Sequence, residues 1–407
     1  MSNLLYFVHR LPYPPNKGDK LGSYHLLAHL AKRHKIYLGT FVDDPDDWQY
    51  VDVLRSLCAE VRAVPLHPGV AKIGSARGLL SGEALSLPFY RKAQLMSWAR
   101  DLATRVPLDA SVIYSGVMAQ YAMVFPELPM LLNFADVDSA KWTQYAPQHR
   151  WPMSWVYARE GRKLLAFEQE AARAAQCSFF VTANEVALFR QLSPGLDAEL
   201  DVLGNGVDAD RFAPDDARPN PFQADEIPLV FTGAMDYWPN VDAVSWFAEA
   251  VLPQLRQRFA TLRFHIVGRS PAPAVQALAQ QPGIKVTGTV PDVRPYLQHA
   301  AAVVAPLRVA RGIQNKVLEA MAMGQPVVVA RNCAEVISPD PTLAELLPAD
   351  SAEDYVAHLS SLIEDRALAA RVGAAGRQCV LSRFSWDAHL SVVDRHLDAL
   401  LAEKETA

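Results

Sequence analysis

The sequence has few cysteines. The four of them stand far apart among the 407 residues, and they form neither a Cys-x-x-Cys pair nor any other spacing typical of a metal site. Such usage is typical of a reducing compartment, so we expect free thiols in a cytoplasmic protein. The cysteines are Cys58, Cys177, Cys333 and Cys379.

Long apolar runs are also missing. The N-terminal apolar stretch, Leu4–Val8, is too short for a signal peptide or a membrane-spanning helix. No later segment is long and apolar enough to cross a bilayer. Any membrane contact is therefore expected to be peripheral, at the inner face of the membrane.

Positive charge is not in excess. The 39 lysines and arginines face 44 aspartates and glutamates, and the net charge of −5 argues against a general nucleic-acid binder. No predicted strand is followed by G-x-G-x-x-G, so a dinucleotide-dependent oxidoreductase is also disfavoured. Half of the residues are hydrophobic and a fifth are charged, which is the composition of a globular protein long enough for two domains.

What is present is a regular alternation of short apolar runs and helical patterns. This alternation predicts an α/β fold with two doubly wound, Rossmann-like domains, each built on a parallel sheet. The predicted strands are Leu4–Val8, Ile36–Phe41, Ser111–Tyr114, Leu131–Phe134, Ser178–Thr182, Leu200–Leu203, Leu229–Thr232, Arg263–Val267, Ile284–Thr287, Ala302–Ala305 and Val327–Ala330. In the second series the predicted helices are 240–258, 271–280, 291–299 and 315–323.

The alternation pauses after Leu203. The segment "GNGVDADRF" is rich in turn formers, and four prolines follow in residues 213–228. We therefore predict a first domain over 1–204, a linker over 205–227 and a second domain over 228–382. A C-terminal helix over 383–407 either packs on its own domain or crosses back to the first.

The segment "RGIQNKVLEAMAMGQPVVVA", at 311–330, predicts a loop, a short helix and a strand at the carboxyl edge of the second sheet. Ligands bind at this edge in open α/β sheets. Gly312 permits close approach of the backbone, and a helix from Asn315 offers free N–H groups that suit phosphate oxygens. The cations nearby are Arg308, Arg311 and Lys316.

Glu319 follows Lys316 by three residues and shares nearly the same helix face. A carboxylate there can accept hydrogen bonds from two vicinal hydroxyls, as on a ribose. Phosphate-binding cations beside such a carboxylate predict a nucleotide diphosphate as ligand. The alternative is a surface ion pair worth ~0.3 kcal/mol.

Two segments of the first domain also carry candidate residues. Gly18, in "PPNKGD", stands where a loop after the first strand would approach a phosphate at a helix N-terminus. Asp136 and Asp138 follow a predicted strand, and Tyr114 and Ser115 end a neighbouring one, so we expect them to line one cavity. An N-cap role for Asp138 or for Ser139 is the alternative.

Residues 141–176 mix aromatic and basic side chains. Amphipathic rings beside cations suit the headgroup boundary of an anionic membrane, and the alternative is that the rings are packed in the protein. The aromatic residues include Trp142, Tyr145, Trp151, Trp155 and Tyr157, and the cations include Arg150, Arg159, Arg162 and Lys163.

These segments together resemble the family-4 glycosyltransferases, which have the GT-B fold of two Rossmann-like domains facing across a cleft. The resemblance rests on "LEAMAMGQPV", in which Glu319 matches the second glutamate of an E-x7-E motif, and on "NGVD", "GAMDYWPNVDA", "HIVGRSP" and "PPNKGD", which occur in the family's order. The segments "HRLPYPPNKGDK", "DVDSAKW" and "GIQNKVLEAMAMG" resemble the bacterial exopolysaccharide sugar transferases of exosortase systems.

The resemblance implies site residues and shows two departures. It places Gly233 at the donor, and it gives Asp136 or Asp138 an acceptor or leaving-group role rather than that of a metal ligand. The first glutamate of E-x7-E is replaced by Arg311, and the cation pair expected after the second domain's first strand is missing from "GAMDYWPN". We therefore expect the diphosphate to meet other cations, namely Arg308, Arg311, Lys316 and Arg269.

The sequence thus predicts a hexosyltransferase that uses a nucleotide diphosphate-sugar donor and a saccharide or lipid-linked saccharide acceptor, in exopolysaccharide biosynthesis. The reaction is expected to retain the anomeric configuration and to need neither metal nor cofactor. Two alternatives stay open: a catalytically inactive nucleotide-sugar-binding assembly subunit, which the arginine at 311 favours, and a nucleotide-sugar epimerase of the same fold.

Overall fold

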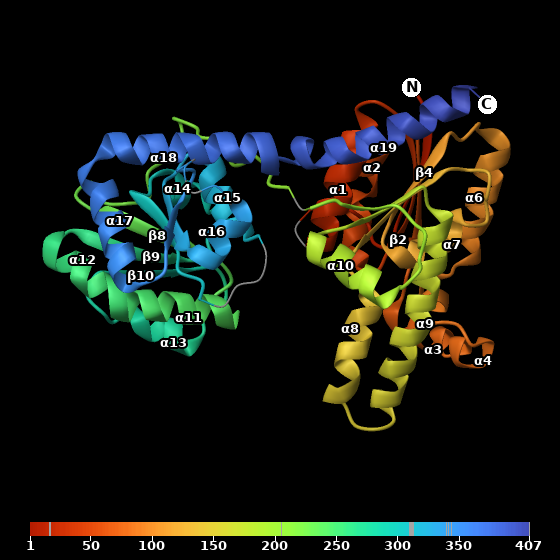
Figure 1. Ribbon diagram of the computed structural model, residues 1–407, viewed down its shortest axis with the longest axis horizontal. Helices are drawn as coiled ribbons and strands as arrows, with labels where there is room; N and C mark the ends of the chain where they lie inside the picture. Colours follow the sequence, from red (N-terminus) through yellow and green to blue (C-terminus); the bar gives the residue numbers. More distant parts are fainter. Residues whose placement is uncertain are drawn as a thin grey trace. The chain divides into compact units, whose positions relative to one another are not determined.

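The computed structural model describes residues 1–15, 18–204, 206–308, 313–338, 340, 342 and 344–406, and within these it leaves out the side chains of residues 18–19, 148 and 403–406. The chain forms two compact units. The first contains Met1–Asn205 together with His389–Ala407, and the second contains Gly206–Ala388. Figure 1 shows each unit as a sheet covered by helices.

The first unit is built on a seven-stranded parallel sheet of order β3-β2-β1-β4-β5-β6-β7. Its strands are β1 (Asn3–Val8), β2 (Lys35–Val42), β3 (Glu60–Pro65), β4 (Ala110–Tyr114), β5 (Met130–Ala135), β6 (Cys177–Phe180) and β7 (Leu200–Val202). Its helices are α1 (Gly18–Ala31), α2 (Val51–Leu57), α3 (Pro68–Ser75), α4 (Arg77–Ser81), α5 (Ser86–Tyr90), α6 (Ala93–Arg105), α7 (Ala119–Ala122), α8 (Asp138–Tyr145), α9 (Met153–Ala174) and α10 (Ala183–Leu192).

The second unit is built on a six-stranded parallel sheet of order β10-β9-β8-β11-β12-β13. Its strands are β8 (Ile227–Thr232), β9 (Leu262–Val267), β10 (Ile284–Gly288), β11 (Ala302–Ala305), β12 (Val327–Ala330) and β13 (Leu347–Ala349). Its helices are α11 (Trp238–Trp246), α12 (Leu252–Arg258), α13 (Pro273–Leu278), α14 (Arg294–Gln298), α15 (Asn315–Ala322), α16 (Arg331–Ile337), α17 (Ala352–Glu364) and α18 (Arg366–Cys379).

The prediction of two parallel-sheet α/β domains is confirmed. Central strands such as β1 and β12 are nearly continuous apolar runs because helices bury both of their faces. The two strands that the sequence did not reveal, β3 and β13, both lie at a sheet edge. There half-exposed residues, or a proline as in β13, weaken the apolar signal.

The helix expected over 240–258 is interrupted. Between α11 and α12 lies a π-helical turn, Phe247–Val251, and Pro253 occupies the first turn of α12. Proline has no backbone N–H to donate, so the regular i to i−4 ladder cannot continue through it.

The last helix, α19 (Trp386–Thr406), begins in the second unit and continues in the first. On the first unit, His29 contacts Asp394 at 2.9 Å and Arg33 contacts Asp398 at 3.0 Å. The ring of His396 meets that of Phe179 edge to face. The terminal helix is therefore an integral part of the first unit.

Candidate functional site

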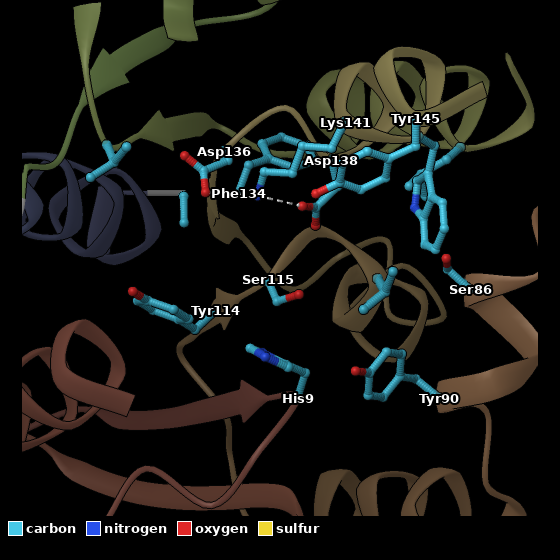
Figure 2. A pocket seen from close by; sticks show the side chains of 15 residues that line it. His9, Ser86, Tyr90, Tyr114, Ser115, Phe134, Asp136, Asp138, Lys141 and Tyr145 are labelled. Carbon is cyan, nitrogen blue, oxygen red and sulfur yellow. Dashed lines mark hydrogen bonds and ion pairs between the residues drawn. The ribbon is translucent and has the colours of Figure 1, made fainter. Parts of the chain in front are cut away.

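The first unit contains a pocket of about 550 Å³ at the carboxyl ends of its central strands (Figure 2). Parallel strands end at the same edge, so His9 after β1, Ser115 after β4 and Asp136 after β5 come together there. Further residues of the lining come from α5, α8 and α9: Ser86, Tyr90, Asp138, Lys141, Trp142, Tyr145 and Leu164. Tyr114 and Ser115, predicted to line one cavity with Asp136 and Asp138, do so.

Two strands end at this pocket with residues in the left-handed region. Ser115 has φ 83° and Ala135 has φ 65°, although neither is glycine. Both are held by Asn133, whose carbonyl accepts from the Ser115 N–H at 2.8 Å and whose side chain accepts from the Ala135 N–H at 2.8 Å. Conformations of this kind cost of order 1–3 kcal/mol each and cluster at functional sites.

Asp136 and Asp138 share one cation. The ammonium of Lys141 donates to Asp136 at 2.8 Å and to Asp138 at 3.0 Å. Burial alone would lower the pKa of Lys141, but the two carboxylates outweigh it and raise that pKa. The N-cap alternative for Asp138 is wrong. The N-cap position of α8 is occupied by Val137, and Asp138 is the first residue of the helix itself.

Ser139 is not an N-cap either. Its hydroxyl and its N–H donate to the two oxygens of Glu168, at 2.5 and 3.1 Å. Glu168 is buried, and desolvation raises its pKa to about 8. It holds the first turn of α8, and with it Asp138. The sequence contained a signal for this role, since Glu160, Leu164 and Glu168 fall on one buried face of α9.

The second unit contains a pocket of about 390 Å³ at the carboxyl ends of β8, β9 and β10. Four predicted donor residues line it: Gly233, Arg269, Lys316 and Glu319. The rest of the lining is small or apolar, and consists of Thr232, Ala234, Val267, Gly268, Thr289, Val290 and Val293.

Lys316 is a partly buried cation of this pocket. Its ammonium donates to the side-chain oxygen of Asn240 and lies 4.4 Å from the centre of the Phe231 ring. Burial lowers its pKa to about 8. Asn240, which was not among the predicted site residues, is fixed by its own bond to the Ala234 carbonyl at 2.8 Å. It stands in the "GAMDYWPN" segment that lacks cations.

The two glycines of the pocket create its space. A Cβ on Gly268 would lie 1.7 Å from the Gly233 carbonyl oxygen, so the chain passes too closely there for any side chain. A Cβ on Gly233 would lie 2.8 Å from Asn240 and 3.1 Å from the Lys316 ammonium. Glycine at both positions therefore leaves the lysine accessible from the pocket.

Glu319 lies one turn after Lys316 on α15. Burial raises the pKa of Glu319, and the nearby charges of Arg211 and Lys316 offset part of this effect. No hydrogen bond or ion pair joins the carboxylate of Glu319 to Lys316, although both side chains are described. Arg211, in the segment between the sheets, was not predicted by any motif.

The remaining donor candidates are placed differently. Arg308 forms an ion pair with Asp242 at 2.5 Å and does not line the pocket. Asn315 is the exposed first residue of α15, and Gly18 is the first residue of α1. Arg311 and Gly312 lie outside the described residues. Their donor roles stay predictions.

The predicted membrane segment divides into two parts. Arg159 is buried, and its guanidinium donates to the carbonyls of Gly78 at 2.7 Å and of Glu83 at 3.0 Å. The expectation that Arg159 meets lipid is therefore wrong. Arg162 and Lys163 are exposed. Across the part of the chain that the structure describes, no helix has the length and apolarity needed to span a bilayer.

One group of described residues brings together metal-ligand atoms. Cys177, Glu199 and His396 have ligand atoms within 4.8 Å of one another, at the β6–β7 edge of the first sheet. His396 already contacts Asp201 at 3.2 Å, which accounts for its position as an ordinary paired side chain.

The fold is shared with known structures. HepE of Anabaena, in complex with UDP, is 14% identical with a TM-score of 0.61, over 98% of this chain and 100% of that chain. A glycosyltransferase of Rickettsia africae is 15% identical with a TM-score of 0.62, over 98% of both chains. Sucrose-phosphate synthase of Thermosynechococcus elongatus is 15% identical with a TM-score of 0.60, over 99% of this chain and 100% of that chain.

At these identities the likeness shows the fold, and the two units have the GT-B fold that the sequence predicted. No curated protein matches the chain. Residues 226–365, which contain the second pocket, match the family described as glycosyl transferases group 1.

Proposed function

We propose that this protein is a glycosyltransferase that moves a hexose from a nucleotide diphosphate-sugar to a saccharide or lipid-linked saccharide. The observation that carries the proposal is the pocket of the second unit, where Lys316 and Glu319 lie at the carboxyl edge of the sheet. The match to the group 1 glycosyl transferases covers the same residues.

The donor is assigned from the chemistry of that pocket. A diphosphate replaces the water that the partly buried ammonium of Lys316 has lost, and the lowered pKa of Lys316 reflects that loss. The carboxylate of Glu319 accepts the ribose hydroxyls. The solved structures of HepE contain UDP, UDP with glucose, and UDP-glucose, which supports a nucleoside diphosphate-sugar as the donor class.

The acceptor is assigned to the pocket of the first unit. Carboxylates accept hydrogen bonds from sugar hydroxyls, and aromatic faces pack against the apolar faces of sugar rings. Asp136 and Asp138 supply the first contact, and Tyr90, Tyr114 and Trp142 supply the second. Of the two carboxylates, the one that faces the attacking hydroxyl receives its proton. By resemblance the reaction retains configuration, and we assign no nucleophile.

The cations of the two pockets support a transfer reaction that needs no metal ion. The leaving diphosphate needs positive potential, which fixed cations and dipoles provide as well as a divalent ion does. Lys316 and Arg269 offer it in the second unit. In the first unit the ammonium of Lys141 already lies between the two carboxylates of the Asp-x-Asp sequence. The biological setting that we propose is exopolysaccharide biosynthesis at the inner membrane face.

The experiment that tests the proposal has two stages. A thermal-shift panel of nucleoside diphosphates and their sugars identifies the donor, because a 100-fold excess over Kd stabilises the fold by ~2.7 kcal/mol. The donor found is then incubated with the full-length protein and with saccharide and lipid-linked saccharide acceptors, with and without EDTA. We expect release of nucleoside diphosphate that persists in excess EDTA.

The outcomes distinguish the glycosyltransferase from the inactive assembly subunit and from the epimerase. Binding without hydrolysis or transfer identifies the inactive assembly subunit, and conversion of the donor sugar to an epimer identifies the epimerase. Activity abolished by EDTA and restored by Mg²⁺ or Mn²⁺ contradicts the metal-independent mechanism. Absence of any nucleotide-induced shift contradicts the donor assignment itself.

A further inference from the structure

Two segments of the first unit concentrate its exposed apolar side chains. Of the 17 large hydrophobic side chains that are exposed among the described residues, eight lie in residues 68–81 and 145–163. They include Ile73 at 80% exposure, Leu80 at 93% and Trp151 at 81%. Soluble proteins normally scatter such residues singly, so a concentration of this kind marks an interaction surface.

The two segments belong to one piece of the structure. Arg159 of α9 donates to carbonyls of residues 78 and 83, at either end of α4. Glu160 accepts from the N–H groups of Leu85 at 2.6 Å and Ser86 at 2.9 Å, at the start of α5. Figure 1 shows α3 and α4 beside the lower part of α9. These hydrogen bonds of buried Arg159 and Glu160 fix α3 and α4 against the hairpin of α8 and α9.

The charge of these segments has one sign. Residues 68–81 and 145–163 contain the exposed cations Lys72, Arg77, Arg150, Arg162 and Lys163. Their single carboxylate, Glu160, is buried. None of the five cations forms an ion pair with a described carboxylate. In a chain of net charge −5, this is a local reversal of sign.

We propose that the exposed side chains of residues 68–81 and 145–163, here called the docking face, bind the surface of an anionic phospholipid bilayer. Apolar side chains enter the boundary between headgroups and acyl chains, and the cations meet lipid phosphates. This proposal deepens the proposed function and rests on it for the acceptor. Tyr145 lines the pocket of the first unit and is also 47% exposed, so the pocket is continuous with the docking face.

The continuity specifies the acceptor class. Trp142 and Tyr145 form an edge-to-face pair, with ring centres 6.4 Å apart, on the helix that carries Asp138. A saccharide bound at Asp138 and attached to a lipid has an apolar path from the pocket to the bilayer across these rings. The acceptor is therefore inferred to be a lipid-linked saccharide.

Vesicle co-sedimentation of the full-length protein, without any sugar donor, tests the docking face. We expect binding to phosphatidylglycerol-containing vesicles and at least tenfold weaker binding to phosphatidylcholine alone. Arg162→Gln with Lys163→Gln should weaken binding roughly 25-fold, since each cation near the surface contributes about fivefold. Ile73→Ser with Leu80→Ser and Trp151→Ser should weaken it by more than tenfold, because apolar area no longer leaves water.

Matched controls lie in the second unit. Arg366→Gln with Arg371→Gln on α18 removes the same charge, and Val336→Ser with Leu381→Ser removes exposed apolar surface. Both should bind vesicles as the wild type does. Thermal shifts with the nucleotide found above report folding of every variant and separate failure of docking from failure of donor binding.

Three results overturn the proposal. They are no binding of the wild type to anionic vesicles at low salt, equal binding of docking-face and control variants, and a lipid-free dimer that the triple variant of Ile73, Leu80 and Trp151 dissociates. The last result identifies the face as a contact between two copies of the chain. Docking without any sugar transfer contradicts the proposed function and leaves the surface assignment standing.

Discussion

The two pockets contain the same pair of residue types on a helix, a lysine and a carboxylate, but the lysine has different partners in each. Each receives a short helix after a parallel strand, and on each helix a lysine and a carboxylate stand three residues apart, Asp138 with Lys141 and Lys316 with Glu319. In the first unit the pair is closed at 3.0 Å. In the second unit Lys316 turns instead to the neutral side chain of Asn240.

The electrostatics follow from this difference. The pKa of Lys141 is raised by its two carboxylates, against the effect of burial, whereas burial lowers the pKa of Lys316 to about 8. A satisfied ion pair shapes a pocket and holds its carboxylates in place. An ammonium bound only to an amide retains capacity for an anion. Identical spacing along a helix therefore does not fix the role of a lysine, because its surrounding partners decide that role.

The sharpest test removes the cation of the second pocket. Lys316→Met should weaken nucleoside diphosphate binding by ~2–5 kcal/mol, the usual cost of removing one partner of a buried charge pair. Binding of the nucleoside should change little. Titration calorimetry measures both, and Lys141→Met in the first unit serves as the matched control with unchanged donor affinity. Equal losses of affinity for the diphosphate and the nucleoside would contradict the assignment of Lys316 to the diphosphate.

Glu319→Gln should have the next largest effect, ~1–3 kcal/mol, because a buried hydroxyl then loses its charged acceptor. The nucleoside and the diphosphate should be affected alike, since both carry the ribose. Glu335→Gln, an exposed carboxylate of α16, is the control. Unchanged nucleotide affinity in a folded Glu319 variant removes this residue from the donor site.

The pH dependence of donor binding should follow Lys316. Below its pKa of about 8 the free protein already carries the charge, so this group causes no pH dependence there. Above that value binding must take up a proton, and affinity should fall by up to about tenfold per pH unit until the pKa of the complex is reached. Calorimetry between about pH 8 and 10 measures the slope. A Lys316→Met variant that keeps the slope would falsify the assignment.

The smallest expected effect on donor binding is that of Asp136→Asn, which should leave nucleotide affinity within about twofold. Turnover should nevertheless fall, because an acceptor-side group acts on the reaction rather than on nucleotide binding. The kcat and the KM for donor, measured together, separate the two effects. A large rise in donor KM with unchanged kcat contradicts the division of labour between the pockets.

The sequence predicted the parts of this molecule that depend on local pattern. Continuous apolar runs located the central strands, and the "LEAMAMG" segment located the helix that carries Lys316 and Glu319. Two of the edge strands, β3 and β13, were missed because half-exposed residues or a proline weaken their apolar runs. Asn240 and Arg211 were missed because their roles depend on contacts between elements far apart in the chain. Glu168 was missed although it shares one face of α9 with Glu160 and Leu164. Arg159 was misassigned because the sequence of α9 alone does not reveal that its guanidinium is buried against residues 78 and 83.

The position of α19 has a consequence for the order of events on the ribosome. The first unit contains residues from both ends of the chain, and Leu390, Val393 and Leu397 of its last helix are buried. During synthesis the seven strands of the first sheet emerge early, but the helix that pairs with His29 and Arg33 arrives only after the whole second unit has been made. We therefore expect a nascent chain or a fragment ending near residue 205 to expose the apolar surface that α19 covers, and to be a poor candidate for separate expression.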